Sequence, residues 1–436
     1  MSPTSSAQAR PAPSTFVTFD DWTGARTLAS LGTNAGSESL PFQHWRRFKE
    51  AFAPELVELA VTETPGTVSH IVDPFGGSGT TALASQFLGA TPTTIEVNPY
   101  LADLIEAKLA PIDFSQASLA FSRVVHRAMS NGGDSSSAFP GAPKTLVEPG
   151  LQGRFVFFRD IADRIVAYRT AIDAEPDLAT KRLFRVILAS ALVPASNVVV
   201  SGKGRRYRRN WRTRSVPADT VDKMFREGVL QALADLRRFA DRRCRRYSIL
   251  RGDARWLASN LPVHDLAVFS PPYPNSADYT DVYNLELWVM GYLRSRNDNA
   301  ALRLQTLRSH VQIHRDMSSE RLNSPLLAKT VLALAENRHS LWNPHIPAMI
   351  SAYAGDMVAV IKGIAERIRP RGRVYIVVGD SKYAGIHVPM ASILSELCPT
   401  LGFRILRLEP CRSLRVSPQQ GGSKDLPESL LVLGRC

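Results

Sequence analysis

Two parts of the chain alternate short apolar runs with longer stretches of helical apolar spacing. In the first part, an apolar run at 69–72 precedes a helical stretch at 81–88, and a run ending at 94–98 precedes a helix that reaches about residue 109. In the second part, the apolar runs are 247–250, 265–269, 374–378, 403–408 and 429–433, and the helical stretches are 285–293, 351–368 and 388–397. This alternation predicts βαβ units in a mostly parallel sheet. We expect the last strand to be antiparallel, as the hairpin partner of the strand before it across a turn at Gly421-Gly422.

The region between the two parts has a different pattern. Residues 131–150 are rich in Gly, Ser and Pro, which is typical of a flexible linker. Helical spacing follows at 155–172 and 178–192, and another helix begins near Asp219. We therefore predict four segments. They are a disordered tail at 1–15, a first part of an α/β domain at 16–109, a helical basic insertion at 110–246, and the second part of the α/β domain at 247–436.

Composition restricts the classes of protein and of site. The chain has 436 residues, of which 44% are hydrophobic and 21% charged, as in folded globular proteins. Its four cysteines are scattered, which argues against a zinc site or a disulfide framework and fits the reducing cytoplasm. We see no apolar run near the roughly 18 residues of a membrane span. The histidines between 294 and 345 lack metal-ligand spacing, so we expect surface positions for them and no metal.

Charge points to a polyanionic partner. The formal net charge is +13, and its densest cluster lies at 203–214 in the insertion. Guanidinium groups interleaved with two aromatic rings suit phosphate contact and stacking on bases, and no acidic residues balance them as they would on a solvated loop. The residues that we expect to bind nucleic acid are Lys203, Arg205, Arg206, Tyr207, Arg208, Arg209, Trp211, Arg212 and Arg214. A second cluster at 237–246 is nearly as well explained as a solvated helix face.

The glycine-rich stretch from Asp73 to Thr81, Asp-Pro-Phe-Gly-Gly-Ser-Gly-Thr-Thr, follows the first predicted strand. A strand that turns through glycines into a helix directs backbone N–H groups at a crevice, so we expect a polar ligand there. No lysine follows the glycines as in a P-loop, and the Gly-x-Gly-x-x-Gly order is missing. Glu96 stands about 20 residues further on, where nucleotide-binding α/β units carry an acid for ribose hydroxyls. Asp253 and Ser270 follow later strands and should reach the same sheet edge.

An aromatic and basic stretch precedes the first strand. It leads into an amphipathic helix that Pro54 opens at a first-turn position. One interpretation is a simple packing helix. The other, which we favour, is a lid in which Phe48, Phe52 and Pro54 cover whatever the glycine turn binds.

The stretch 73–81 together with Ser270-Pro271-Pro272-Tyr273 resembles the S-adenosylmethionine-dependent DNA amino-methyltransferases, which methylate cytosine N4 or adenine N6. The resemblance covers about 40–109 and 247–436 and leaves out the insertion. It implies a Rossmann-like class I methyltransferase fold, with a seven-stranded, mostly parallel sheet that has one antiparallel strand. By resemblance, the glycine motif binds the methionine part of the cofactor, Glu96 its ribose and Asp253 its adenine. The implied cofactor-binding residues are Asp73, Phe75, Gly76, Gly77, Gly79, Thr80, Thr81, Glu96, Asp253, Phe48 and Phe52.

The same resemblance gives catalytic roles to Ser270, Pro271, Pro272 and Tyr273. An aromatic amine must be polarised before it attacks a sulfonium methyl group, and the Ser270 hydroxyl and Pro271 carbonyl can accept its two protons. The two prolines fix the backbone, and Tyr273 stacks on the extruded base. Transfer is then in line, without a catalytic cysteine.

The expected function is site-specific methylation of double-stranded DNA, with cytosine N4 favoured because serine leads the motif. Adenine N6 methylation, an RNA amino-methyltransferase and an inactive nucleic-acid-binding protein are the alternatives. The family places its recognition region after the third strand or after the Pro-Pro-Tyr segment, so residues 274–345 are a second candidate DNA-contacting segment beside the insertion. A cognate restriction or defence protein is an expected partner, and a membrane is not.

Overall fold

The computed structural model describes residues 16–436 except Ala29, Lys49 and the ranges 202–203, 275–277 and 416–423. The tail predicted at 1–15, the turn predicted at Gly421-Gly422 and the basic residue Lys203 therefore lie outside the described residues.

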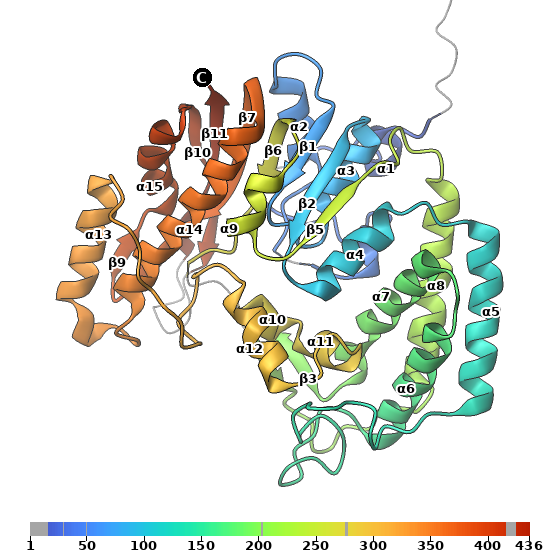
Figure 1. Ribbon diagram of the computed structural model, residues 1–436. Helices are drawn as coiled ribbons and strands as arrows, with labels where there is room; N and C mark the ends of the chain where they lie inside the picture. Colours follow the sequence, from blue (N-terminus) through green and yellow to red (C-terminus); the bar gives the residue numbers. More distant parts are fainter. Residues whose placement is uncertain (1–15, 29, 49, 202–203, 275–277, 416–423) are drawn as a thin grey trace, which may run out of the picture.

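A seven-stranded sheet forms the centre of the molecule, in the order β10-β11-β7-β6-β1-β2-β5 (Figure 1). β11 runs antiparallel to both β7 and β10, whereas β7, β6, β1, β2 and β5 pair in parallel. The strands are β1 (His70–Asp73), β2 (Thr91–Glu96), β5 (Ser248–Arg251), β6 (His264–Phe269), β7 (Ile368–Gly379), β10 (Phe403–Arg415) and β11 (Lys424–Arg435). This is the Rossmann-like class I methyltransferase fold, and the predicted antiparallel last strand is confirmed.

Helices cover both faces of the sheet because the central strands are apolar on both sides. All six residues of β6 are buried. Leu266 and Val268 belong to the core on one face, and Ala267 and Phe269 to the core on the other, as the alternation of side chains along a strand requires. Helices of the α/β domain and its N-terminal segment are α1 (Phe19–Thr23), α2 (Glu55–Glu63), α3 (Thr80–Leu88), α4 (Pro99–Leu109), α9 (Ala254–Leu257), α14 (Ile346–Arg367) and α15 (Met390–Leu397).

Among the described residues, α14 is the one helix that is long and apolar enough to cross a membrane, and 67% of its most apolar window is buried in the fold. This helix differs from the expectation that no apolar run approaches the length of a membrane span. The burial identifies α14 as a core helix against the sheet, and a core helix satisfies the same test of length and composition.

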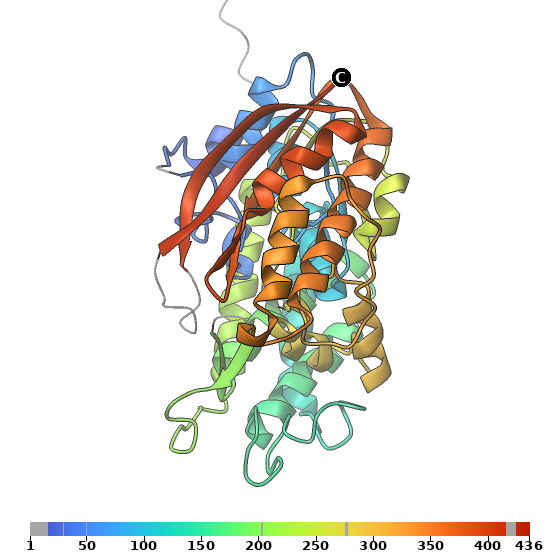
Figure 2. The same cartoon turned by 90° about the vertical axis from the view of Figure 1, so that its left-hand side faces the viewer.

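The insertion is built from four helices that pack on one another: α5 (Phe114–Asn131), α6 (Arg159–Asp173), α7 (Leu178–Ala195) and α8 (Thr220–Arg238). It lies at the end of the molecule opposite the C-terminus in both views (Figures 1 and 2). α5 was not predicted. Its buried positions include Ala117, Ala120 and Ala128, and alanine at helical spacing gives a weak hydrophobic signal.

Smaller elements complete the chain. A hairpin of β3 (Val198–Ser201) and β4 (Gly204–Tyr207) leads into the basic run, which β4 begins. After β6 come α10 (Tyr279–Val282), α11 (Asn284–Val289), α12 (Arg296–Leu304) and α13 (Pro325–Glu336), and β8 (Ser381–Tyr383) pairs with β9 (Ile386–Val388). The helix predicted at 285–293 is shorter than expected and ends before Gly291, whose φ is +77°.

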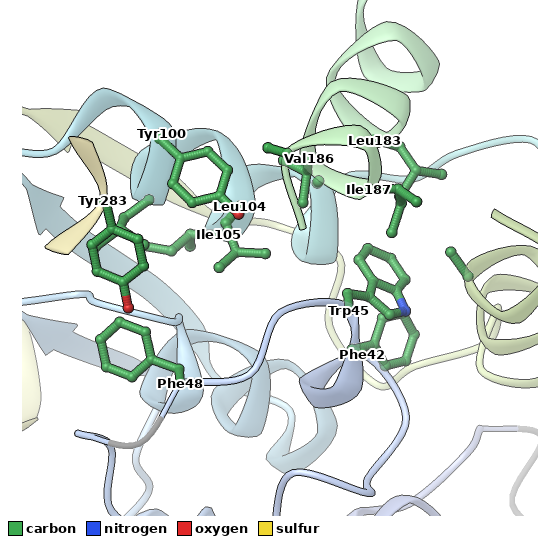
Figure 3. Close-up of a cluster of buried hydrophobic side chains, with 14 of the residues drawn as sticks. Phe42, Trp45, Phe48, Tyr100, Leu104, Ile105, Leu183, Val186, Ile187 and Tyr283 are labelled. Carbon is green, nitrogen blue, oxygen red and sulfur yellow. The ribbon is translucent and has the colours of Figure 1, made fainter. Parts of the chain in front are cut away.

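An aromatic and aliphatic cluster joins the insertion to the α/β domain (Figure 3). Phe42 and Trp45, before α2, lie beside Leu183 and Ile187 of α7. The backbone N–H of Phe42 and the indole Nε1–H of Trp45 both donate to Asp235 Oδ2 of α8, each at 2.8 Å. Because these contacts are buried, they hold the insertion in one orientation beside the sheet.

Candidate active site

One cavity, partly open to solvent, lies at the carboxyl ends of β1, β2, β5 and β6. This is the sheet edge where α/β folds bind ligands. The predicted site residues that line it are Phe48, Phe52, Asp73, Phe75, Gly76, Gly77, Thr80, Glu96, Asp253, Ser270 and Pro272. The fold thus brings together groups that are up to 224 positions apart in the sequence, from Phe48 to Pro272.

Neighbouring side chains lie so close to the backbone of the glycine turn that they determine its shape. A Cβ atom on Gly76 would lie 2.3 Å from Thr94 Cγ2, so no side chain fits there. Gly77 and Gly79 have φ of +52° and +79°, which favour glycine. Gly79 is the N-cap of α3, and the Thr81 hydroxyl donates to the Val268 carbonyl at 3.1 Å. Thr81 therefore anchors α3 to β6, although it was predicted as a cofactor ligand.

A buried lysine that sequence reasoning missed supports the turn from below. Lys108 Nζ donates to the Ser78 carbonyl at 2.7 Å and to Gln43 Oε1 at 3.1 Å, and its side chain is fully buried. Burial lowers the pKa of Lys108 to about 7. Nothing in the local sequence distinguishes this lysine from the basic last-turn residues that are common at helix ends.

Two buried carboxyl groups face the cavity from β1 and β2. Asp73 Oδ1 accepts the Phe75 N–H at 2.8 Å. Glu96 accepts the Gly77 N–H on Oε2 at 2.7 Å and the Asn98 N–H on Oε1 at 2.8 Å. Burial raises the pKa of each carboxyl group to about 7. Each Glu96 oxygen keeps a second lone pair, so the group can still accept hydroxyl donors from a ligand.

Asp253 is held by an arginine that was not predicted. Its carboxylate caps α9 by accepting the Arg255 N–H at 2.9 Å, and it pairs with the Arg255 guanidinium at 2.6 Å. Arg255 also donates to the Leu304 carbonyl at 3.0 Å. The pair fixes the β5–α9 turn against the C-terminal end of α12.

The segment before α2 packs against the glycine turn, and its role as a lid over a ligand stays a prediction. The Phe48 ring stacks on Tyr283, with centroids 6.0 Å apart and an interplanar angle of 8° (Figure 3). A Cβ atom on Gly77 would lie 3.2 Å from Phe48 Cζ. Pro54 is the N-cap of α2, one residue before the helix begins. Arg46 Nη2 pairs with buried Glu286 at 2.6 Å, which ties the lid to α11.

The Ser-Pro-Pro-Tyr segment leaves β6 at the cavity. Ser270 and Pro272 line the cavity, and Ser270 Oγ lies 3.1 Å from the Tyr273 hydroxyl. That hydroxyl donates to Glu428 Oε1 of β11 at 2.7 Å, and burial raises the pKa of Tyr273 well above its usual value. Stacking of the Tyr273 ring on a base stays a prediction.

A histidine that was expected at the surface instead lines the cavity. His310 is 3% exposed, its Nε2 lies 3.5 Å from Asp278 Oδ2, and its Nδ1 has no hydrogen-bond partner among the described residues. Burial lowers its pKa to about 4, so the ring is neutral near pH 7. The surface assignment failed because the loop that follows α12 folds back over the cavity together with Asp278 and Thr280.

The basic run divides into two groups. Arg208 donates to the Ser196 and Val193 carbonyls at 3.0 and 3.1 Å, and Arg214 donates to the Pro194 carbonyl at 2.8 Å, so both stabilise the end of α7. Arg205 Nη2 donates to Asn284 Oδ1 of α11 at 3.2 Å. The exposed residues of this run include Arg206, Arg209 and Arg212.

The two aromatic residues of the run pack together. The Tyr207 and Trp211 ring centroids lie 5.1 Å apart, and the Arg212 guanidinium lies 4.8 Å from the Trp211 ring centroid. Their stacking on bases, like phosphate contact by the arginines, stays a prediction. Within the described part of the chain, no three His, Cys, Asp or Glu side chains cluster as a metal site would require.

Two curated relatives resemble most of the chain. The type II methyltransferase M.AvaI of Nostoc sp. is 24% identical, in a match that spans 88% of this chain and 83% of the relative. The type II methyltransferase M.BsoBI of Geobacillus stearothermophilus is 22% identical, with 88% and 82% covered. No family model matches the chain.

Among solved structures, TrmN from Thermus thermophilus matches with 11% identity and a TM-score of 0.29, over 88% of this chain and 49% of that one. The rRNA methyltransferase AviRa from Streptomyces viridochromogenes matches with 9% identity and a TM-score of 0.28, over 88% and 85%. Likeness at this level supports no conclusion about this chain.

Proposed function

We propose that this chain is an S-adenosylmethionine-dependent DNA methyltransferase that modifies the exocyclic amino group of an extruded base, with cytosine N4 as the target. The observation that carries the proposal is the single cavity shared by the glycine turn, Glu96 and Ser270. A nucleoside-binding half and an amine-polarising half in one cavity are what methyl transfer between a cofactor and a base needs.

The residues present fit the cofactor. Gly76 and Gly77 both line the cavity, so the backbone of the turn borders the space that a ligand would occupy. Asp73 suits the ammonium of the methionine part, and Glu96 has lone pairs for the vicinal ribose hydroxyls. Asp253 borders the place expected for the adenine, and Phe48 and Phe52 exclude water from above. When bound, the cofactor supplies an electrophilic methyl group on a sulfonium sulfur.

The chain's own groups then act on the amine. The Ser270 hydroxyl oxygen and the Pro271 carbonyl accept hydrogen bonds from the two N–H groups of the amine. These bonds direct the nitrogen lone pair towards the methyl donor. Serine at position 270 supports cytosine N4 over adenine N6, by resemblance to the N4 branch of the family. The phenol ring of Tyr273 and the two prolines hold the base in position.

Duplex DNA is the proposed substrate. The net charge of +13 and the exposed arginines of the basic run at 203–214 supply attraction to phosphate. The two type II methyltransferases that resemble the chain support the same class of reaction. We further propose that the enzyme acts in the cytoplasm beside a cognate restriction or defence protein, and that the insertion and residues 274–345 both contact DNA.

The proposal is tested by incubating the protein with methyl-labelled cofactor and either duplex DNA or RNA of matched length. We expect label in DNA, and a loss of about 100-fold or more in kcat for Ser270→Ala with cofactor affinity unchanged. Label in RNA alone would overturn the substrate, and a fully active Ser270→Ala enzyme would overturn the site.

A further inference from the structure

A buried series of hydrogen bonds leads from Ser270, just after β6, to Glu428 on β11, with β7 between the two strands. Ser270 Oγ and the Tyr273 hydroxyl are 3.1 Å apart, and the Tyr273 hydroxyl lies 2.7 Å from Glu428 Oε1. Glu428 is 1% exposed and lies on β11, where it pairs with Gly379 of β7 and Arg412 of β10.

Arg412 neutralises this carboxylate from the edge strand. Its Nη2 donates to Glu428 Oε1 at 2.9 Å, and its Nε donates to Oε2. A guanidinium keeps its proton, and a carboxylate that it grips in this bidentate way is ionised. Glu428 is therefore an acceptor only.

The number of protons on each group fixes which atom donates in each of these hydrogen bonds. Tyr273 has one hydroxyl proton, which it donates in the hydrogen bond to Glu428. Towards Ser270 the Tyr273 oxygen can therefore only accept a hydrogen bond. The Ser270 proton is thereby engaged away from the cavity. What Ser270 presents to the cavity is its lone pairs.

We propose that Glu428, together with Arg412, is the positioning residue that makes Ser270 an obligatory hydrogen-bond acceptor for the substrate amino group. This inference rests on the proposed function. A serine hydroxyl that rotated freely would point its own proton at the nitrogen lone pair for part of the time and weaken the nucleophile. The carboxylate on β11 removes that orientation before the base arrives, which is pre-organisation of the acceptor.

The network predicts how variants behave. In Glu428→Gln, the amide N–H can donate to Tyr273, whose proton is then released towards Ser270. We expect kcat to fall roughly 10-fold or more, while the KM for DNA and the Kd for the cofactor stay within about 2-fold. Tyr273→Phe keeps the ring and removes the relay oxygen, and its kcat should fall by a similar factor.

The double variant separates this role from a structural one. Because both changes break the same chain, Glu428→Gln with Tyr273→Phe should be no slower than the slower single variant. If the fold-reduction in kcat of the double variant equals the product of the two single reductions, the inference is overturned. A Glu428→Gln enzyme with unchanged kcat would also overturn it. Glu409→Gln is the matched control, since Glu409 lies on β10 with a half-exposed side chain and pairs with Arg407 at 3.5 Å.

Two checks keep the outcomes distinct. If Glu428→Gln lowers the melting temperature so far that it is not folded, Tyr273→Phe decides, because it leaves the Glu428–Arg412 pair intact. Unchanged kcat in Tyr273→Phe then overturns the inference. If the wild-type protein transfers no methyl group to DNA, the proposed function fails instead.

Discussion

At the residue scale, the site depends on polar groups that the fold has removed from water. Asp73, Glu96 and Lys108 are buried around one glycine turn, and each has a pKa near 7 because burial disfavours its charged form. Burying such groups lowers the stability of the ligand-free fold, whereas a bound ligand can give them hydrogen-bond partners. Their placement is what we expect of a site built for a charged, hydroxyl-rich ligand.

Glu96 should therefore give two pH effects of opposite sign. Its pKa is raised from about 4.5 to about 7 in the folded protein, so its contribution to the free energy of unfolding is present below pH 4.5 and is lost as the pH rises through 7. Cofactor hydroxyls favour the ionised group, so cofactor affinity should rise over the same interval. Glu96→Gln should flatten both curves, as measured by thermal melting and calorimetric titration. An unchanged affinity profile would contradict the ribose role.

Gly76 offers a steric test of the turn. Gly76→Ala places a Cβ against Thr94, which should destabilise the fold by about 1–3 kcal/mol and weaken cofactor binding. Gly355→Ala is the control. Gly355 lies within α14, and its Cβ would meet no atom closer than 3.8 Å, so we expect a gain of roughly 0.5–1 kcal/mol. Denaturant unfolding of both variants checks the pair.

At the element scale, the ends of four parallel strands meet at one cavity, and the exposed arginines of the basic run lie on β4 and just after it. β1, β2, β5 and β6 bring their carboxyl ends to one cavity, and β3–β4 lies beside α10 and α11. Arg205 bridges the hairpin to Asn284. Both segments proposed to contact DNA therefore meet at this place.

The exposed arginines of the basic run at 203–214 should act through phosphate. Arg206→Ala, Arg209→Ala and Arg212→Ala should each weaken DNA binding for all sequences alike and reduce the salt slope by about 1. Arg404→Ala is the control, since Arg404 pairs with Gly434 near the C-terminus, at the opposite end of the molecule from β3 (Figure 1). Binding titrations at several salt concentrations make the comparison. If the salt slope of DNA binding is the same for the basic-run variants and the control, the DNA does not bind at these arginines.

The elements that were predicted correctly share strong local signals. β1, the glycine turn and α3 were readable because an apolar run, glycines and helical spacing follow one another directly. α5 was missed because alanines form most of its buried face. Glu428, His310 and Lys108 gave no local signal, because their surroundings are made by distant segments such as β7, β10 and the loop after α12. The guanidinium groups of Arg208 and Arg214 hold the end of α7, which the basic pattern did not indicate, and their contact with DNA stays a prediction.

At the scale of the whole molecule, a class I methyltransferase fold carries a four-helix insertion between its second and third parallel strands. The insertion is fixed to the fold by the cluster around Phe42 and Trp45, so the hairpin is presented from a rigid base (Figure 3). The basic surface, the cavity and the acceptor role that we propose for Ser270 are the features on which the proposed methylation of a base in DNA rests.

Nucleoside analysis of the methylated product tests this account most directly. Duplex DNA is incubated with the protein and labelled S-adenosylmethionine, digested to nucleosides, and separated by chromatography with mass detection. The account predicts label in N4-methylcytosine. Label in 5-methylcytosine, or no label in any DNA nucleoside, would contradict it, and label in N6-methyladenine would keep the amino-group chemistry but contradict the cytosine assignment.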